Sequence, residues 1–194
     1  MKKNKRSALV IAAHPDDEVL GCGGTIAKLV SKKIEVNVVY ISNGVGSRIK
    51  TKIKFKSELK KRKNAAKISC KILGVRSCNF ADLADNQLDK YPLLKIIKII
   101  EKYIKKFKPE KIYTHFKNDL NVDHQIVNQA VVTASRPQKN NSVKSLFFFE
   151  VPSSTEWRID AKSKMFNPNW FEDISSFKNK KFKALKAYSL ELRK

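Results

Sequence analysis

Two kinds of apolar segment alternate along the chain. Short runs rich in Val and Ile are typical of strands buried on both faces of a sheet, and longer stretches with an apolar residue every three or four positions predict helices. Strands are predicted at 7–13, 35–41, 76–80, 111–114 and 145–151. Helices are predicted at 18–31, 55–73, 91–107, from the acidic loop 117–123 through Ser135, and at 177–192.

This alternation of strands and helices indicates the fold class. It predicts an α/β protein of Rossmann-like form, with an open and mostly parallel sheet covered by helices on both faces. The length of 194 residues suits a single domain spanning 1–194. Gly74, which follows the helix predicted at 55–73, is expected to be its C-terminal cap.

Polar residues follow every predicted strand. Ligands of open parallel sheets bind beyond the carboxyl ends of the strands, so these segments are expected to share one cleft. They are 14–18, 43–48, 82–89, 115–124 and Glu150. The glycines at 21, 23 and 24 come after an acidic run and lack the spacing of a dinucleotide-binding loop, which argues against a nicotinamide or flavin cofactor.

Composition and charge indicate the cellular compartment and the classes of binding partner. No apolar run is long enough to span a membrane, and no cleavage site follows the basic start, so we expect a cytoplasmic protein. Three cysteines without metal-type spacing predict no disulfide framework. The net charge of +23 is spread along the chain without interleaved aromatic residues, which argues against nucleic acid and leaves a solvated surface or an anionic substrate. The oligomeric state stays open, with a homo-oligomer among the alternatives.

The chemistry is concentrated in two short segments. His14 and Asp17 lie at the end of the first strand, and His124 begins a later helix at the same predicted edge. Two imidazoles and a carboxylate can hold a catalytic zinc with one position left for water, and iron(II) suits the same ligands. Asp16 would then lie beside that water, where a general base belongs. Proline and acidic residues also suit an ordinary helix start, but a plain helix start does not account for a histidine at both segments.

These segments resemble a known family. The run Ala-His-Pro-Asp-Asp-Glu at 13–18, followed by Gly-Cys-Gly-Gly-Thr at 21–25, is similar to the hallmark of the LmbE-like (PIG-L) zinc deacetylases. Asp-Leu-Asn-Val-Asp-His at 119–124 resembles the second metal motif of that family, and weaker matches lie at 43–48 and 85–86. The resemblance covers roughly the whole chain. It implies hydrolysis of an N-acetyl group from an amino sugar or sugar conjugate. The basic net charge leaves open a substrate that is linked to a nucleotide or phosphate.

The resemblance also implies roles for individual residues. The zinc ligands correspond to His14, Asp17 and His124, and the general base corresponds to Asp16. Arg48 and Asp85 are similar to residues that hold the sugar. Asp123 resembles a carboxylate that orients the groups around the metal.

The chain departs from the family pattern in two respects. Many members carry a histidine at the position of Asn121, where it stabilises the oxyanion. The Asn121 amide can donate a hydrogen bond but no proton, so either Asp16 is both base and acid or His115 substitutes. The second departure is the end at Lys194, where similar proteins often continue with a segment that closes the site.

Two further readings of function remain open. In the first, the chain is a catalytically weakened member of the family that binds an anionic glycan or nucleic acid. In the second, it is a metal amidase that acts on a different acyl group. Acetate release, salt-sensitive binding to polyanions and a panel of acyl chains separate these readings.

Overall fold

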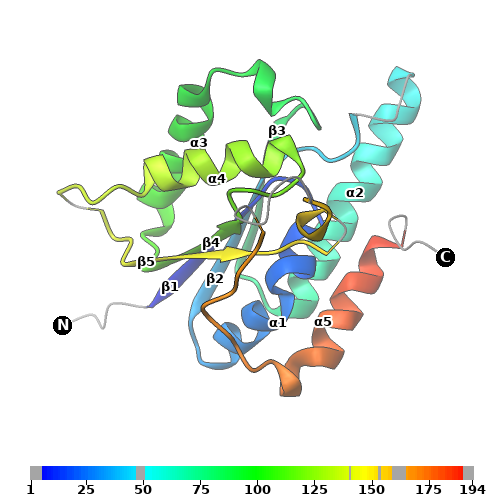
Figure 1. Cartoon of the computed structure of the whole chain (residues 1–194). Helices are drawn as coiled ribbons and strands as arrows, with labels where there is room; N and C mark the ends of the chain where they lie inside the picture. The colour runs from blue at the N-terminus through cyan, green and yellow to red at the C-terminus, as the bar shows by residue number, and fades with distance from the viewer. Residues whose placement is uncertain (1–5, 47–50, 140, 153, 159–164, 190–194) are drawn as a thin grey trace.

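The computed structural model describes residues 6–46, 51–139, 141–152, 154–158 and 165–189. Its centre is a sheet of five parallel strands in the order β3-β2-β1-β4-β5 (Figure 1). The strands are β1 (Ser7–Ala12), β2 (Glu35–Ser42), β3 (Ser77–Leu83), β4 (Lys111–His115) and β5 (Ser145–Phe149). The predicted parallel α/β class is confirmed.

Helices cover both faces of the sheet (Figure 1). One layer contains α1 (Asp17–Ser31), α2 (Lys52–Leu73) and α5 (Lys178–Leu185), which contact one another, and the other contains α3 (Leu93–Phe107) and α4 (Val122–Ala134). Short 3-10 turns complete the chain at η2 (Leu88–Lys90), η3 (Thr155–Trp157), η5 (Ser175–Phe177) and η6 (Lys186–Tyr188). No helix in the described ranges is long and apolar enough to cross a membrane.

The central strand divides the core into two halves. Every residue of β1 is buried, and successive side chains of a strand point to opposite faces. Ala8, Val10 and Ala12 therefore belong to the core beneath α1, α2 and α5, whereas Leu9 and Ile11 belong to the core beneath α3 and α4. This burial on both faces explains why the strand appears in the sequence as an unbroken apolar run.

Several element boundaries differ from those predicted. α2 begins at Lys52 rather than at residue 55, because its first turns are exposed and apolar periodicity does not mark their start. β3 continues to Leu83, where it pairs with Ser42 beyond an irregularity in the register. The predicted terminal helix is shorter: α5 ends at Leu185 and passes into η6. Gly74 has φ 86° at the end of α2, which confirms it as a left-handed cap.

The order of the strands determines where a site can form. From β1 the chain passes to β2 and β3 on one side, and β4 and β5 lie on the other side. The segments that leave β1 and β4 therefore diverge toward opposite layers of helices, and the sheet opens between them at its carboxyl edge. The sequence places His14 directly after β1 and His115 at the end of β4.

Gly21 allows α1 to lie against β5. A Cβ atom at residue 21 would overlap the ring of the buried Phe149, the last residue of β5. Gly21→Ala is expected to lower the free energy of unfolding by about 1–3 kcal/mol, because added volume in a packed core forces neighbours to shift. Gly46→Ala is the control, since its Cβ would meet Asp85 at an ordinary 3.6 Å. Denaturant unfolding of both variants measures the difference, and equal stability would contradict this packing.

Candidate metal centre

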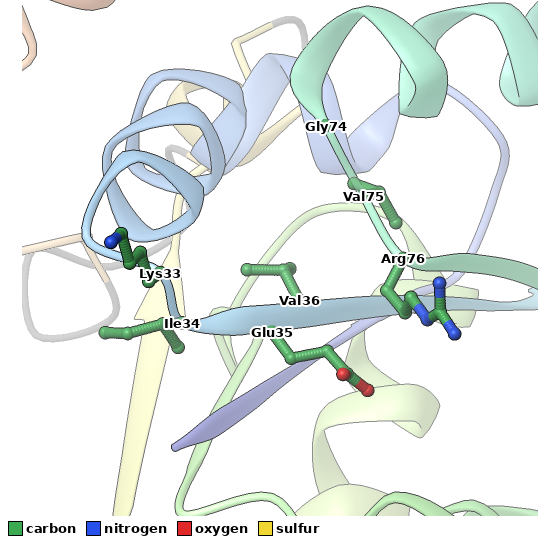
Figure 2. Close-up of a pocket in the computed structure, with 7 residues that line it drawn as sticks. All are labelled: Lys33, Ile34, Glu35, Val36, Gly74, Val75 and Arg76. Atoms are coloured by element: carbon green, nitrogen blue, oxygen red, sulfur yellow. The ribbon is translucent and has the colours of Figure 1, made fainter. Parts of the chain in front are cut away.

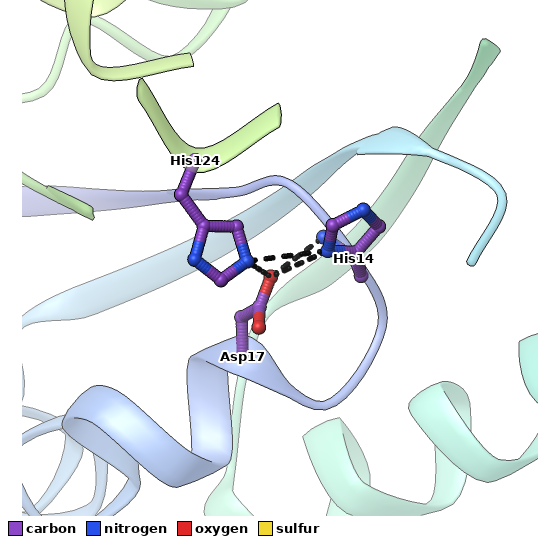
Figure 3. Close-up of side chains that lie close together, drawn as sticks. All are labelled: His14, Asp17 and His124. Atoms are coloured by element: carbon purple, nitrogen blue, oxygen red, sulfur yellow. Dashed lines mark hydrogen bonds and ion pairs between the residues drawn. The ribbon is translucent and has the colours of Figure 1, made fainter. Parts of the chain in front are cut away.

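Three side chains from three segments meet at the carboxyl edge of the sheet. His14 lies in the turn after β1, Asp17 is the first residue of α1, and His124 lies in the first turn of α4. Figure 3 shows the two rings and the carboxylate pointing toward one another. His124 lies 110 positions after His14 in the sequence, and the opening between β1 and β4 brings it to the other two side chains.

The spacing of the three donor atoms fits a tetrahedral metal ion. His14 Nδ1, Asp17 Oδ2 and His124 Nε2 lie 3.3 Å from one another along all three edges. Metal–ligand bonds of about 2.0–2.1 Å in a tetrahedron separate the ligands by about 3.3–3.4 Å. The three atoms also lie close enough together to share one ion. These residues could therefore hold zinc or iron(II) with one position open.

Carboxylates contact the ring nitrogen of each imidazole that faces away from the other donors. His14 Nε2 lies 3.0 Å from Asp123 Oδ2 and 3.4 Å from Asp85 Oδ1, and His124 Nδ1 lies 3.1 Å from Asp119 Oδ1. A proton on each of these outward nitrogens leaves the opposite nitrogen of each ring as the metal donor. Carboxylates in this position are typical of metal-binding histidines.

A second group of donors shares His14 but is less suited to a metal. His14, Asp85 and Asp123 also lie close together. However, the two oxygens of Asp123 already accept backbone N–H groups, from Asn86 at 2.9 Å and from Leu88 at 3.0 Å. Asp123 therefore acts as an anchor between the η2 segment and His14, and the group containing Asp17 is the better metal site.

The electrostatics of the group are dominated by buried negative charge. Burial opposes the charged forms of His14 and His124, yet the surrounding carboxylates outweigh it. Hydrogen bonds with Asp123 and Asp17 hold the pKa of His14 well above its usual range, and Asp17 and Asp119 raise the pKa of His124 to about 9. Burial would raise the pKa of Asp17, but the charge of His124 holds it well below its usual range.

Asp16 lies beside this group with an unusual environment. Burial and the charge of Asp17 raise the pKa of Asp16 to about 8, partly opposed by Arg62. Arg62 Nη1 donates to Asp16 Oδ2 at 3.2 Å and to the carbonyl oxygen of Pro15 at 3.1 Å. A carboxylate with a raised pKa next to a metal site is suited to accept and return a proton near neutral pH.

His115, the last residue of β4, packs against His124 of the metal group. It is fully buried, its ring stacks on His124 at 3.9 Å between centroids, and its Nε2 accepts the backbone N–H of Ala13 at 2.8 Å. Burial, and then the charge of His124, holds the pKa of His115 well below its usual range. A neutral, enclosed ring of this kind is a poor proton donor, so the arrangement favours Asp16 over His115 as the acid.

The remaining predicted site residues have different positions. Asn121 is the N-cap of α4: its Oδ1 accepts the N–H of Asp123 at 2.8 Å, and its Nδ2 donates to Asn86 at 3.2 Å. The amide carries a second N–H that can donate elsewhere. Asp85 is buried behind His14 rather than open to solvent. Arg48 lies outside the described residues.

Three contributors to the site are not evident from the sequence. Asp119 orients His124 and accepts hydrogen bonds from Ser154 at 3.0 Å and Thr155 at 2.6 Å. Arg62 contacts Asp16 from α2, and Glu18 is fully buried beneath it. Asp119 is the first residue of the second motif, and this position is the one sequence signal that points to it. The roles of Arg62 and Glu18 depend on how α2 packs against α1, which the sequence pattern does not show.

A separate pocket lies at the opposite end of the sheet (Figure 2). It surrounds the start of β2 and the turn before β3, and it holds neither a histidine nor a cysteine. Its lining consists of Lys33, Ile34, Glu35, Val36, Gly74, Val75 and Arg76. With one carboxylate and no second metal donor, this pocket has no evident hydrolytic chemistry.

Binding of a metal ion is expected to release protons. The raised pKa values of His14 and His124 favour the protonated form of both rings in the metal-free protein, and a protonated ring must lose the proton on its donor nitrogen to bind a cation. We expect about two protons or more to be released per zinc ion. Calorimetric titration in buffers of different ionisation enthalpy counts them. A count near zero would contradict the charge state deduced from the geometry.

Replacement of Asp119 by Asn is expected to weaken metal binding. The change removes the charge 3.1 Å from His124 Nδ1 but preserves the size of the side chain. Loss of such a carboxylate typically lowers metal affinity by about 10–100-fold. Competition with a chromogenic chelator measures the affinity, with Asp89→Asn, an exposed carboxylate in η2, as the control. Equal affinities in the two variants would remove Asp119 from the site.

The comparisons with known proteins agree with this geometry. Residues 9–135 match the family described as PIG-L: GlcNAc-PI de-N-acetylase. The uncharacterized deacetylase YaiS of Escherichia coli K12 is 29% identical over 157 residues, which are 78% of this chain and 77% of that protein. A 4-oxalmesaconate hydratase of Pseudomonas putida KT2440 is 28% identical over 205 residues, covering 95% of this chain and 74% of that protein.

Solved structures show the same fold. The N,N'-diacetylchitobiose deacetylase of Pyrococcus horikoshii superposes with a TM-score of 0.78 at 20% identity, over 98% of this chain and 72% of that one. The family match covers more than half of the chain and includes His14, Asp17 and His124. The chain therefore belongs to the PIG-L family, whose model is described as a GlcNAc-PI de-N-acetylase.

Proposed function

We propose that the chain is a metal-dependent hydrolase that removes an N-acetyl group from an amino sugar or sugar conjugate. The observation that carries the proposal is the triangle of His14 Nδ1, Asp17 Oδ2 and His124 Nε2, with Asp16 next to it. Zinc is the first candidate for the ion, and iron(II) suits the same donors. When bound, such an ion polarises a carbonyl group and lowers the pKa of its water to about 7.

The residues of the chain have distinct roles in this proposal. Asp16 takes the proton from the attacking water and returns it to the amine that leaves, so one carboxylate is base and then acid. Asn121 donates a hydrogen bond from its amide to the oxygen of the acetyl group as negative charge develops there. Arg48 is proposed to bind the sugar, whereas the burial of Asp85 behind His14 suits it to orienting that ring rather than to contacting the sugar. The products are acetate and a free amino sugar.

The charge distribution supports an anionic form of the substrate. The chain carries a net charge of +23, and several of its acidic residues are buried at the site, which leaves the exterior more basic still. A positive exterior raises the rate at which anionic molecules reach the protein. A sugar linked to a nucleotide or phosphate would therefore reach the protein faster than a neutral sugar.

We also propose that residues 1–194 form one domain and that the protein is located in the cytoplasm.

A second candidate function is hydration of an unsaturated acid. It is favoured by one observation, the 4-oxalmesaconate hydratase that matches 95% of this chain. Addition of water to a double bond would use the same metal ligands and the same base. The two candidates are separated by offering 4-oxalmesaconate and a panel of N-acetylated sugars to the same preparation. If the absorbance of 4-oxalmesaconate falls and no N-acetylated sugar releases acetate, the hydratase function would replace the deacetylase proposal.

The variant Asp16→Asn tests the proposal directly. It is expected to retain the metal, since Asp16 is not one of the three donors, but to lose at least about 100-fold in kcat because an amide cannot take a proton. Acetate release is measured on protein prepared anaerobically and loaded with zinc or iron(II), with Asp89→Asn as the control. Metal retention without acetate release in the wild type, together with salt-sensitive binding to polyanions, would favour the binding-protein reading.

A further inference from the structure

The backbone of Asp16 has a conformation that few residues other than glycine adopt. Its φ is 122° and its ψ is −28°, in the turn that connects β1 to α1. Such a conformation is strained for a residue with a Cβ atom and persists only where the surroundings enforce it. Since Asp16 is the proposed base, the groups that enforce this turn also decide where its carboxylate lies.

Glu18 is a group of this kind. Its side chain is fully buried, although a carboxylate in the first turn of a helix would satisfy the helix dipole equally well from the surface. Glu18 Oε2 accepts the backbone N–H of Asp16 at 3.1 Å. Its other oxygen, Oε1, accepts the hydroxyl of Ser69 at 3.0 Å and the hydroxyl of Tyr188 at 2.8 Å.

The donors to Glu18 come from elements remote in the sequence. Ser69 belongs to α2, and Tyr188 belongs to η6 near the end of the described chain. Arg62 lies seven positions before Ser69, which is about two turns of helix and therefore the same face of α2. This face of α2 therefore restrains Asp16 in two ways. Arg62 donates a hydrogen bond to the side chain of Asp16, and Ser69 donates one to Glu18, which accepts the backbone N–H of Asp16.

We propose that Glu18 is a positioning residue for Asp16, and that Ser69 and Tyr188 act through it. The buried carboxylate fixes the backbone N–H of Asp16, which maintains the turn that sets the position of the Asp16 side chain. This inference rests on the proposed function for its effect on turnover. Its structural half, the restraint on residue 16, stands on the hydrogen bonds alone.

The test compares Glu18→Gln with Cys70→Ala. A glutamine has one acceptor oxygen and no charge, so it cannot accept from Asp16 and from both hydroxyls at once, and any hydrogen bond that it keeps with the Asp16 N–H is no longer charge-assisted. Cys70 is a buried neighbour of Ser69 on α2 whose thiol lies 3.6 Å from the hydroxyl of Tyr40, and that hydroxyl lies 3.4 Å from the hydroxyl of Tyr188. Its truncation therefore perturbs the same network but leaves Ser69 and Tyr188 in place as donors to Glu18. Tyr188→Phe, which removes one donor and no other atom, is the second variant if Glu18→Gln does not fold.

Two measurements are made on each variant. Amide hydrogen exchange by NMR reports on the Asp16 N–H, and it is expected to be faster by at least about tenfold in Glu18→Gln but near wild type in Cys70→Ala. Acetate release by metal-loaded protein is expected to show kcat lowered by at least about tenfold, with KM and metal content unchanged, because misplacing a reacting group affects turnover rather than binding. Tyr188→Phe is expected to show smaller changes in the same direction.

The possible results separate the two proposals. Unchanged exchange at Asp16 in Glu18→Gln, or equal kcat in Glu18→Gln and Cys70→Ala, would overturn the positioning role. A wild-type protein that releases no acetate from any substrate would overturn the proposed function instead. In that case the exchange rate of the Asp16 amide alone decides whether Glu18 restrains residue 16.

Discussion

Negative charge buried at the carboxyl edge of the sheet is the constraint on which the rest of the structure depends. Among the described residues, Asp17, Glu18, Asp85, Asp119 and Asp123 are all buried there. Carboxylates in such surroundings need donors and positive charge close by. Helix N-termini, backbone amides, hydroxyl groups and two imidazoles with raised pKa values supply them in the metal-free protein. A divalent cation would replace the protons on those imidazoles and neutralise the same charge.

Both layers of helices supply hydrogen-bond donors to these buried carboxylates. α4 brings Asp123 and His124 to the opening beside β1, and the η2 segment meets Asp123 with its backbone N–H groups. On the other face, α2 and η6 deliver hydroxyl groups to Glu18. The central strand between them is apolar from Ala8 to Ala12. The buried carboxylates therefore lie at the carboxyl edge, where they organise the site without interrupting this strand.

Much of this arrangement could be predicted from the sequence, and the remainder has a common physical cause. The strands, the parallel class and the three proposed metal donors follow from local patterns: apolar runs, and histidines beside acidic residues at strand ends. The burial of Glu18 and the contact of Arg62 with Asp16 depend on which face of α2 meets α1, and no local pattern encodes this. The early start of α2 was missed because solvated turns carry no apolar period.

The hydrogen bond between Tyr188 and Glu18 joins residues 170 positions apart in the chain. During synthesis, the segment that carries His14 and Asp17 emerges first, and 170 further residues must follow before this buried carboxylate can meet Tyr188. Contacts of such separation slow the search for the native state. A nascent chain that ends before Tyr188 would hold its acidic turn without this hydrogen bond, so the site cannot be completed until residue 188 has been made.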